Sequence, residues 1–280
     1  MDSLMPISDA EFQLMRDLIY RRFGINLGQE KRSLLVSRLQ KILRAGHFPN
    51  FKAYHAYLLE ERSGGAFSEL IDHISTNHTY FSREQAHFEY LHRQALPDVV
   101  QRLRQCNSRD LRVWCAGCSS GEEAYMLLML MRETLGSAYA SYSAGLLATD
   151  ISHRILETAR RGMYSTERMA ALPSELRHKY FVRVEQDQWQ VRPELRQEAV
   201  FRRFNLMNER FPFKEPFHII FCRNVMIYFD QQTRESLIHR FWQALAPGGY
   251  FFIGHSETLG REHGLFEYRI PAAYRKVGGC

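Results

Sequence analysis

Small residues and two glutamates follow a predicted strand at residues 117–123 (GCSSGEE). Glycines allow the backbone to approach a bound ligand closely, and carboxylates at the start of the next helix are well placed to receive a cationic amino group. The same residues match the G-x-S-x-G pattern of a hydrolase nucleophile elbow, with Ser119 as nucleophile and Asp150 and His255 following in the expected chain order. The loop therefore has two possible chemistries, cofactor binding and ester hydrolysis.

The pattern around this loop favours cofactor binding. The loop follows the first strand of the predicted sheet, no earlier strand supplies an oxyanion loop, and a nucleophile elbow has no use for Glu122 and Glu123. Asp150 closes the second predicted strand, where an acidic side chain can accept from both ribose hydroxyls of a nucleoside cofactor. That position fits NAD and S-adenosylmethionine equally. The loop lacks the complete G-x-G-x-x-G pattern and no arginine for a pyrophosphate is evident, which disfavours the dinucleotide.

Strands alternate with helices from residue 111 onward, and this alternation predicts an α/β fold with a parallel sheet and right-handed crossovers. The expected strands are 111–115, 144–149, 200–205, 217–222 and 250–254, with a closing pair within 266–276, and the expected helices are 122–134, 152–162 and 231–244. Open α/β sheets bind ligands at the carboxyl ends of their strands. The polar residues that follow these strands are therefore expected to share one edge of the sheet.

Two further parts accompany the predicted sheet. Residues 1–75 are predicted to form a domain of helices ahead of a catalytic domain at 76–280, and Ser8 with Glu11 three residues later makes a capping box for the first helix. Alternating apolar residues at 181–199 predict a small antiparallel ribbon inserted before the third strand.

Residues 77–83 (NHTYFSR), the loop at 117–123 and the segment 217–229 (FHIIFCRNVMIYF) resemble the bacterial chemoreceptor glutamate methyltransferases, the CheR family, across nearly the whole chain and in order. The resemblance implies a class I S-adenosylmethionine-dependent methyltransferase. Its fold would be Rossmann-like, with a mostly parallel sheet and an antiparallel last strand, a small N-terminal all-helical domain and the inserted antiparallel ribbon. The residues that the resemblance implies for binding S-adenosyl-L-methionine are Asn77, Thr79, Arg83, Glu123, Asp150, Asn205, Leu206, Arg223 and Asn224.

The implied reaction is attack by a glutamate carboxylate of the receptor on the sulfonium methyl, which leaves a γ-methyl ester and S-adenosylhomocysteine. No general base is needed, because a carboxyl group with a reference pKa of about 4.3 is already ionised near neutral pH. Arg83 and Tyr228 are the expected catalytic residues. A guanidinium matches a carboxylate, and an aromatic face stabilises a sulfonium as it does other cations. A module that binds S-adenosylmethionine or RNA without catalysis is the remaining alternative.

The receptor is expected to meet the second helix. Arg38, Lys41 and Arg44 step by three along its exposed side, and the resemblance places them against the acidic, glutamate-bearing helical region of a chemoreceptor. Some family members also hold a receptor's C-terminal peptide on the ribbon, through a loop that contains glycine. Residues 185–188 (EQDQ) are short and lack glycine, so we expect this chain to act without such tethering.

Composition bears on the possible partners, cell compartment and metal content of the protein. The net charge of +6 over 280 residues permits an anionic partner, but basic and aromatic residues are not interleaved as a nucleic-acid platform requires. Neither a secretory signal nor a membrane-spanning run is evident, so we expect a cytoplasmic protein. The odd count of five cysteines argues against a disulfide framework, and the pair Cys115-x-x-Cys118 lacks a second pair, so no metal is expected. The other cysteines are Cys106, Cys222 and Cys280.

Overall fold

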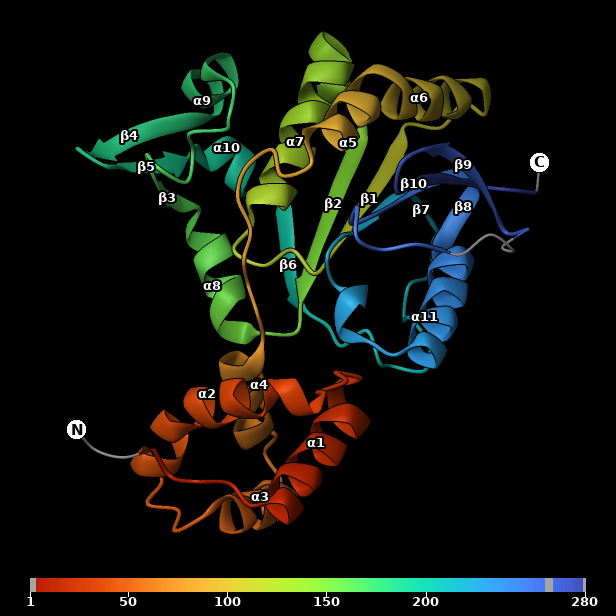
Figure 1. Cartoon of the computed structure of the whole chain (residues 1–280). Coiled ribbons are helices and arrows are strands. Elements are labelled where there is room, and N and C mark those ends of the chain that lie inside the picture. The colour runs from red at the N-terminus through yellow and green to blue at the C-terminus, as the bar shows by residue number, and fades with distance from the viewer. Residues whose placement is uncertain (1–3, 260–263, 279–280) are drawn as a thin grey trace.

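A seven-stranded sheet forms the centre of the larger part of the molecule (Figure 1). The computed structural model describes residues 4–259 and 264–278. The strand order is β6-β2-β1-β7-β8-β10-β9. The first five strands are parallel to one another, and β10 runs antiparallel to both of its neighbours, β8 and β9. The strands are β1 (Asp110–Ala116), β2 (Ser143–Asp150), β6 (Ala199–Arg203), β7 (Phe217–Cys222), β8 (Leu245–Ile253), β9 (Phe266–Ile270) and β10 (Ala273–Lys276). This confirms the predicted fold class.

Helices cover both faces of the sheet (Figure 1). They are α5 (Gln85–Tyr90), α6 (Leu96–Gln105), α7 (Glu122–Leu135), α8 (His153–Arg161) and α11 (Gln231–Ala244). The apolar layer beside α11 centres on Trp114 of β1, which is fully buried and donates from its indole N–H to the Thr149 hydroxyl at 2.9 Å. Five phenylalanine rings lie within 5.9 Å of this indole, centroid to centroid. The core therefore holds β1 and β2 rigidly up to their carboxyl ends.

The N-terminal part is a separate bundle with its own apolar core, as predicted. Its helices are α1 (Asp9–Phe23), α2 (Arg32–Ala45), α3 (Phe51–Glu60) and α4 (Gly65–Ile74). The predicted capping box starts α1, with both of its reciprocal hydrogen bonds present. The bundle packs against the edge of the sheet where the parallel strands end (Figure 1), and hydrogen bonds from Asn26 to Tyr228 and from Asn205 to Arg22, each 2.8 Å, cross this interface.

The ribbon that the alternating pattern predicts is present as β4 (Phe181–Glu185) and β5 (Gln188–Val191). A third strand, β3 (Met163–Ser165), pairs with β5 and was not predicted, because three residues are too few to show an alternation. The helices α9 (Ser174–Tyr180) and α10 (Pro193–Arg196) flank the ribbon. The predicted strand at 200–205 ends at Arg203, so Asn205 lies in a loop.

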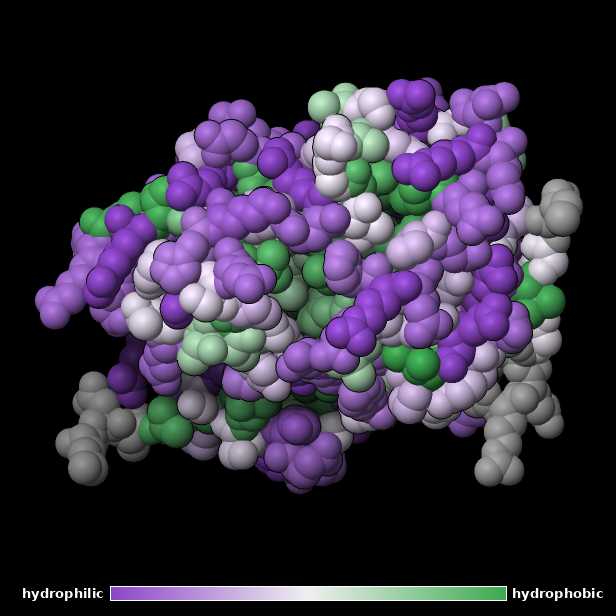
Figure 2. Space-filling view, turned by 90° about the horizontal axis from the view of Figure 1, so that it is seen from above, coloured by the Kyte–Doolittle hydropathy of each residue, from purple (hydrophilic) through white to green (hydrophobic). Residues whose placement is uncertain are grey.

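Hydrophilic side chains cover most of the surface seen from above, and the hydrophobic ones form small separate patches (Figure 2). Within the described residues, no helix combines the length and apolar character needed to cross a membrane. The buried apolar residues form three clusters, one in the helical bundle and two in the larger part of the molecule.

Candidate functional site

The loop after β1 is held by the end of β2. The backbone N–H groups of Gly117 and Cys118 donate to the Thr149 carbonyl at 2.7 and 2.9 Å, and that of Ser119 donates to the Asp150 carboxylate at 2.9 Å. Gly117 has a φ of +86°, and a Cβ there would lie 2.4 Å from Val225. Glycine is required at this position because the loop passes directly against the loop that follows β7.

Asp150 is 8% exposed, and each of its carboxylate oxygens accepts one backbone N–H, from Ser119 and from Ser152. Burial raises the pKa of Asp150, although these donors favour the ionised form. Each oxygen keeps a second acceptor position. The carboxylate can therefore hold the hydroxyls of a ribose while it stays anchored.

Arg223 follows β7 and carries a guanidinium that is only 1% exposed. It donates to Glu123 of α7 at 2.8 Å, to Glu84 at 3.0 Å and to the Arg83 carbonyl. Its guanidinium also lies over the Phe88 ring, 5.2 Å from the centroid. One cation between two carboxylates leaves this cluster with a formal charge of −1 when both are ionised.

Glu84 is a site residue that sequence reasoning missed. Its φ of +56° is left-handed, and its carboxylate also accepts from the Asn224 amide and from the His255 backbone N–H, both at 3.3 Å. Burial opposes ionisation, but Arg223 and these donors hold the pKa of Glu84 below its usual value. Burial raises the pKa of Glu123, which Arg223 partly offsets. The one indication in the sequence was that Glu84 directly follows Arg83, which was itself predicted to bind the cofactor.

The linker between the two parts crosses the same edge. The Asn77 carbonyl accepts from the Ser119 hydroxyl at 3.2 Å, the Thr79 carbonyl accepts from Arg168 at 3.4 Å, and Arg83 donates to the His78 carbonyl at 2.8 Å. The structure therefore brings Asn77 directly against the glycine loop and connects Thr79 to it through Arg168, which donates to the Ser120 hydroxyl at 2.8 Å, whereas Arg83 bonds within the linker.

Asn205 and Leu206 lie beside Asp150, because the Phe204 N–H donates to the Asp150 carbonyl at 2.9 Å. The Asn205 amide is used within the protein, since its nitrogen donates to the Arg22 carbonyl and its oxygen accepts from the Met207 N–H at 3.0 Å. Leu206 is buried in the core next to α11. These contacts join two residues predicted to bind the cofactor to the helical bundle and to the core.

Glu257 anchors the loop that carries Asn224 and Tyr228, and sequence reasoning missed it. Its buried carboxylate accepts backbone N–H groups from Asn224 at 3.0 Å, from Ile227 at 3.1 Å and from Gly254 at 2.6 Å. Burial raises the pKa of Glu257, while the N–H donors lower it. Asn224 has a φ of +59°, and the three bonds stabilise this strained conformation.

Glu122, the other glutamate of the loop, has a structural role. It is fully buried, accepts from the Ser120 hydroxyl at 2.7 Å and forms an ion pair with Arg168. Burial also raises the pKa of the Cys115 and Cys118 thiols well above the usual value, which leaves both protonated. Cys280 lies outside the described residues.

The hydrolase alternative is not supported by the structure. The Ser119 hydroxyl donates to a backbone carbonyl, Asp150 is held by backbone N–H groups, and His255 lies beside His87, with ring centroids 4.6 Å apart. Across residues 4–259 and 264–278, no hydrogen bond links His255 to Asp150 or to Ser119. The three residues therefore do not form a triad.

Two family models match the chain in the order of its two parts. Residues 10–75 match the CheR methyltransferase all-alpha domain, and residues 77–272 match the CheR methyltransferase SAM binding domain. The chain belongs to the CheR methyltransferase family. This CheR protein is therefore an enzyme that uses S-adenosylmethionine.

Relatives of this CheR protein match it over nearly their whole length. The chemotaxis protein methyltransferase of Borreliella burgdorferi is 41% identical over 96% of this chain and 95% of its own. That of Escherichia coli is 35% identical over 98% of this chain and 93% of its own. Among solved structures, the glycopeptide N-methyltransferase MtfA complexed with sinefungin shares 14% identity with a TM-score of 0.32, over 57% of this chain and 49% of that one.

The Glu257 anchor yields a testable expectation. Glu257→Gln replaces one acceptor by an amide that faces backbone donors, so we expect a loss of about 1–3 kcal/mol in the free energy of unfolding and weaker S-adenosylmethionine binding. Urea unfolding and calorimetry measure the two quantities. The control is Glu235→Gln on the exposed side of α11, which should match the parent. A Glu257→Gln protein that equals the parent in both measurements would contradict the anchoring role.

Proposed function

We propose that this chain transfers the methyl group of S-adenosylmethionine to glutamate side chains of chemoreceptors in the cytoplasm. The products are the glutamate γ-methyl ester and S-adenosylhomocysteine. The observation that carries the proposal is the convergence of the linker, the glycine loop, Asp150 and Arg223 at one edge of the sheet. This edge combines ligands for a nucleoside with a negative cluster, in a chain of the CheR methyltransferase family.

The residues at this edge fit the cofactor in charge and in shape. S-adenosylmethionine supplies an electrophilic methyl group on a sulfonium. Asp150 would accept from the ribose, Glu123 would accept from the amino group, and Arg83 would donate to the carboxylate. When both carboxylates are ionised, the cluster of Glu84, Arg223 and Glu123 carries a net negative charge, which favours a ligand with one excess positive charge.

Asn77, Thr79 and Asn224 would complete the cofactor site by backbone and amide contacts, since the first two belong to the linker and the third to the loop after β7. Asn205 and Leu206 would border the adenine from the side of the helical bundle. In this proposal the bundle and the sheet close on the same ligand.

The substrate carboxylate would react without a base, because it arrives ionised. Arg83 would orient it, since only one of the five guanidinium N–H groups is used in the bond to the His78 carbonyl. Tyr228, half-buried after β7, would place its hydroxyl and ring beside the reacting groups. The product ester is neutral, so its attraction to Arg83 falls and release is favoured. Positioning and charge stabilisation would supply the catalysis.

We expect Arg83→Ala to lower methyl transfer about a hundredfold and Tyr228→Phe by at least about tenfold, with the free energy of unfolding changed by less than about 1 kcal/mol. Transfer of labelled methyl groups to receptor-containing membranes and urea unfolding measure these effects. Arg93→Ala, at an exposed arginine, is the matched control. Full rates in both site variants would refute the catalytic assignment. If the parent protein binds the cofactor but transfers no methyl group, the protein would be a sensor and not an enzyme of this kind.

The basic side of α2 divides into two roles. Arg38 is half-buried and donates to the Ile74 carbonyl and, at 3.1 Å, to the Thr76 hydroxyl, so it holds the start of the linker. Lys41 and Arg44 are exposed on the same helix. We assign these two to the encounter with the acidic receptor region and assign Arg38 to the linker. Exposed ion pairs contribute only about 0.2–1 kcal/mol each, so their effect is mainly steering.

The rate of methylation at low receptor concentration should therefore fall as the salt concentration rises. At low salt, Lys41→Glu should be slower than the parent, and its rate should depend less on salt. Lys52→Glu on α3 makes the same charge change at another exposed position and serves as the control. Initial rates at several ionic strengths provide the measurement. A flat salt dependence, or equal effects of both variants, would argue against steering by α2.

We also propose that the chain works without a tethered receptor tail. The turn between β4 and β5 consists of Gln186 and Asp187, and Asp187 is engaged by Thr166 through its carbonyl and its carboxylate. We expect an isolated receptor-tail peptide to show no binding at micromolar concentration in calorimetry. Micromolar binding would overturn this part of the proposal and leave the reaction untouched.

A further inference from the structure

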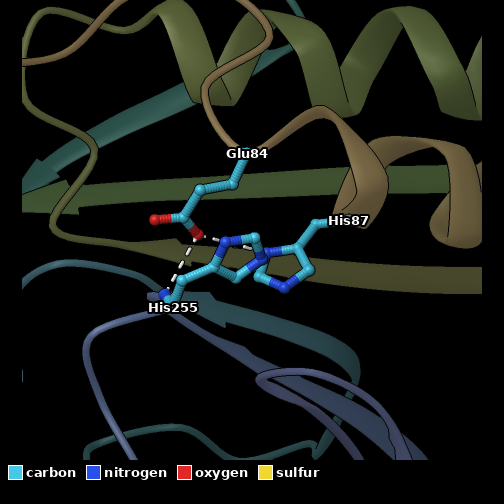
Figure 3. A group of neighbouring side chains, drawn as sticks. All are labelled: Glu84, His87 and His255. Atoms are coloured by element: carbon cyan, nitrogen blue, oxygen red, sulfur yellow. Dashed lines mark hydrogen bonds and ion pairs between the residues drawn. The ribbon is translucent and has the colours of Figure 1, made fainter.

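Glu84, His87 and His255 meet beside the Arg223 cluster (Figure 3), and the proposed methyl transfer assigns no role to the two histidines. Glu84 precedes α5, His87 lies on it, and His255 follows β8. One potential ligand atom from each residue lies within 4.8 Å of the other two. Nδ1 of His87 and a carboxylate oxygen of Glu84 are 3.5 Å apart.

The hydrogen bonding of His87 determines which ring nitrogen carries the proton. Its Nε2 lies 2.9 Å from the Pro271 carbonyl oxygen, which can only accept, so Nε2 is the donor. In the neutral ring Nδ1 then presents a lone pair. The ring is fully buried, and within the described part of the chain Nδ1 has no hydrogen-bond partner. A buried acceptor thus faces a carboxylate oxygen, which is a second acceptor.

We propose that Glu84, His87 and His255 bind a divalent transition-metal ion of the Zn²⁺ class. The buried lone pair on Nδ1 of His87 lacks a donor, and a cation would satisfy it while also contacting the Glu84 carboxylate oxygen that faces it. Zinc takes imidazole nitrogen and carboxylate oxygen at about 2.0–2.2 Å, so neighbouring ligand atoms of a tetrahedral site lie roughly 3.3 Å apart. The 3.5 Å between His87 and Glu84 already meets this requirement.

The surroundings of the three ligands fit the same ion. Metal-bound histidines commonly donate their other N–H to a backbone carbonyl, which is the bond that His87 makes to Pro271. The His255 backbone is held by its N–H bond to Glu84, and its side chain is exposed and can rotate toward the ion. The exposed side of His255 leaves the fourth position to water. This site is separate from the Cys115-x-x-Cys118 pair, whose buried thiols lie on β1 and in the loop after it.

Metal binding would be coupled to the cofactor site, and this part of the inference rests on the proposed function. The Glu84 oxygen that faces His87 also accepts from Arg223 at 3.0 and 3.3 Å. An ion on that oxygen competes with the guanidinium and repels it. Zn²⁺ therefore inhibits methyl transfer, and by thermodynamic linkage bound cofactor and bound ion weaken each other.

Calorimetry on the full-length chain, stripped of metal by a chelator, tests binding directly with Zn²⁺ as the probe. We expect one ion per chain, and visible absorption typical of tetrahedral Co²⁺ when cobalt replaces zinc. His255→Ala should weaken zinc binding at least about tenfold. The matched control is His153→Ala, because exposed His153 and Glu157 form another histidine–carboxylate pair, 3.8 Å apart.

Zinc titration of methyl transfer completes the test. Inhibition of the parent should follow the calorimetric affinity and should need at least about ten times more zinc in His255→Ala. Equal zinc affinity in the parent and in His255→Ala, or equal losses in the two alanine variants, would overturn the proposal. If the metal-free parent protein shows no methyl transfer, only the proposed function is refuted. The metal site is still tested, because calorimetry and the cobalt spectrum do not depend on methyl transfer.

Discussion

The site depends on one buried cation, the guanidinium of Arg223, held between the carboxylates of Glu84 and Glu123. Arg223 follows a central strand, Glu123 lies in the first turn of a helix and Glu84 belongs to the linker, so three distant segments must come together for the charge to be paired. Removing one partner of such a buried group costs roughly 3–5 kcal/mol, because a charge is left without compensation. The cluster therefore fixes the linker over the sheet as well as the charge of the site.

Two further carboxylates act on the backbone instead of on other side chains. Asp150 and Glu257 accept N–H groups from the loops after β1, β2, β7 and β8. Both loops that approach the cofactor position contain a non-glycine residue with positive φ, Ser119 and Asn224. Such conformations are costly and persist where the surrounding structure determines them. At these two positions buried carboxylates hold the strained backbone, since Asp150 accepts the Ser119 N–H and Glu257 accepts the Asn224 N–H.

The helical bundle takes part in this edge as well. Arg38 of α2 holds the end of α4 and the start of the linker, while Asn26 and Arg22 bond to the loops that carry Tyr228 and Asn205. A receptor segment on α2 would therefore lie on an element that is directly connected to the residues of the reaction. In the proposed function, substrate recognition on α2 would thus be joined to the cofactor site through one short segment.

Much of this organisation is visible in local sequence patterns. The alternation of strands and helices, the capping box of Ser8 and Glu11 and the alternating residues of the ribbon are short-range features, and the family resemblance of residues 77–83 and 217–229 led to the cofactor. Glu257 and Glu84 were missed because their roles consist of bonds to residues far away in the sequence or to backbone groups.

The sequence by itself determined the class of fold and the order of its elements, which follow from periodicity within single segments, and its resemblance to a known family implied the cofactor. Only the tertiary structure decided that His255 turns to His87 and Glu84 instead of to Ser119, and that Arg38 faces the linker. Glu84 and His255 are 171 residues apart. The physical reason is that packing of the whole chain, and no local preference, determines which distant polar groups share a buried site.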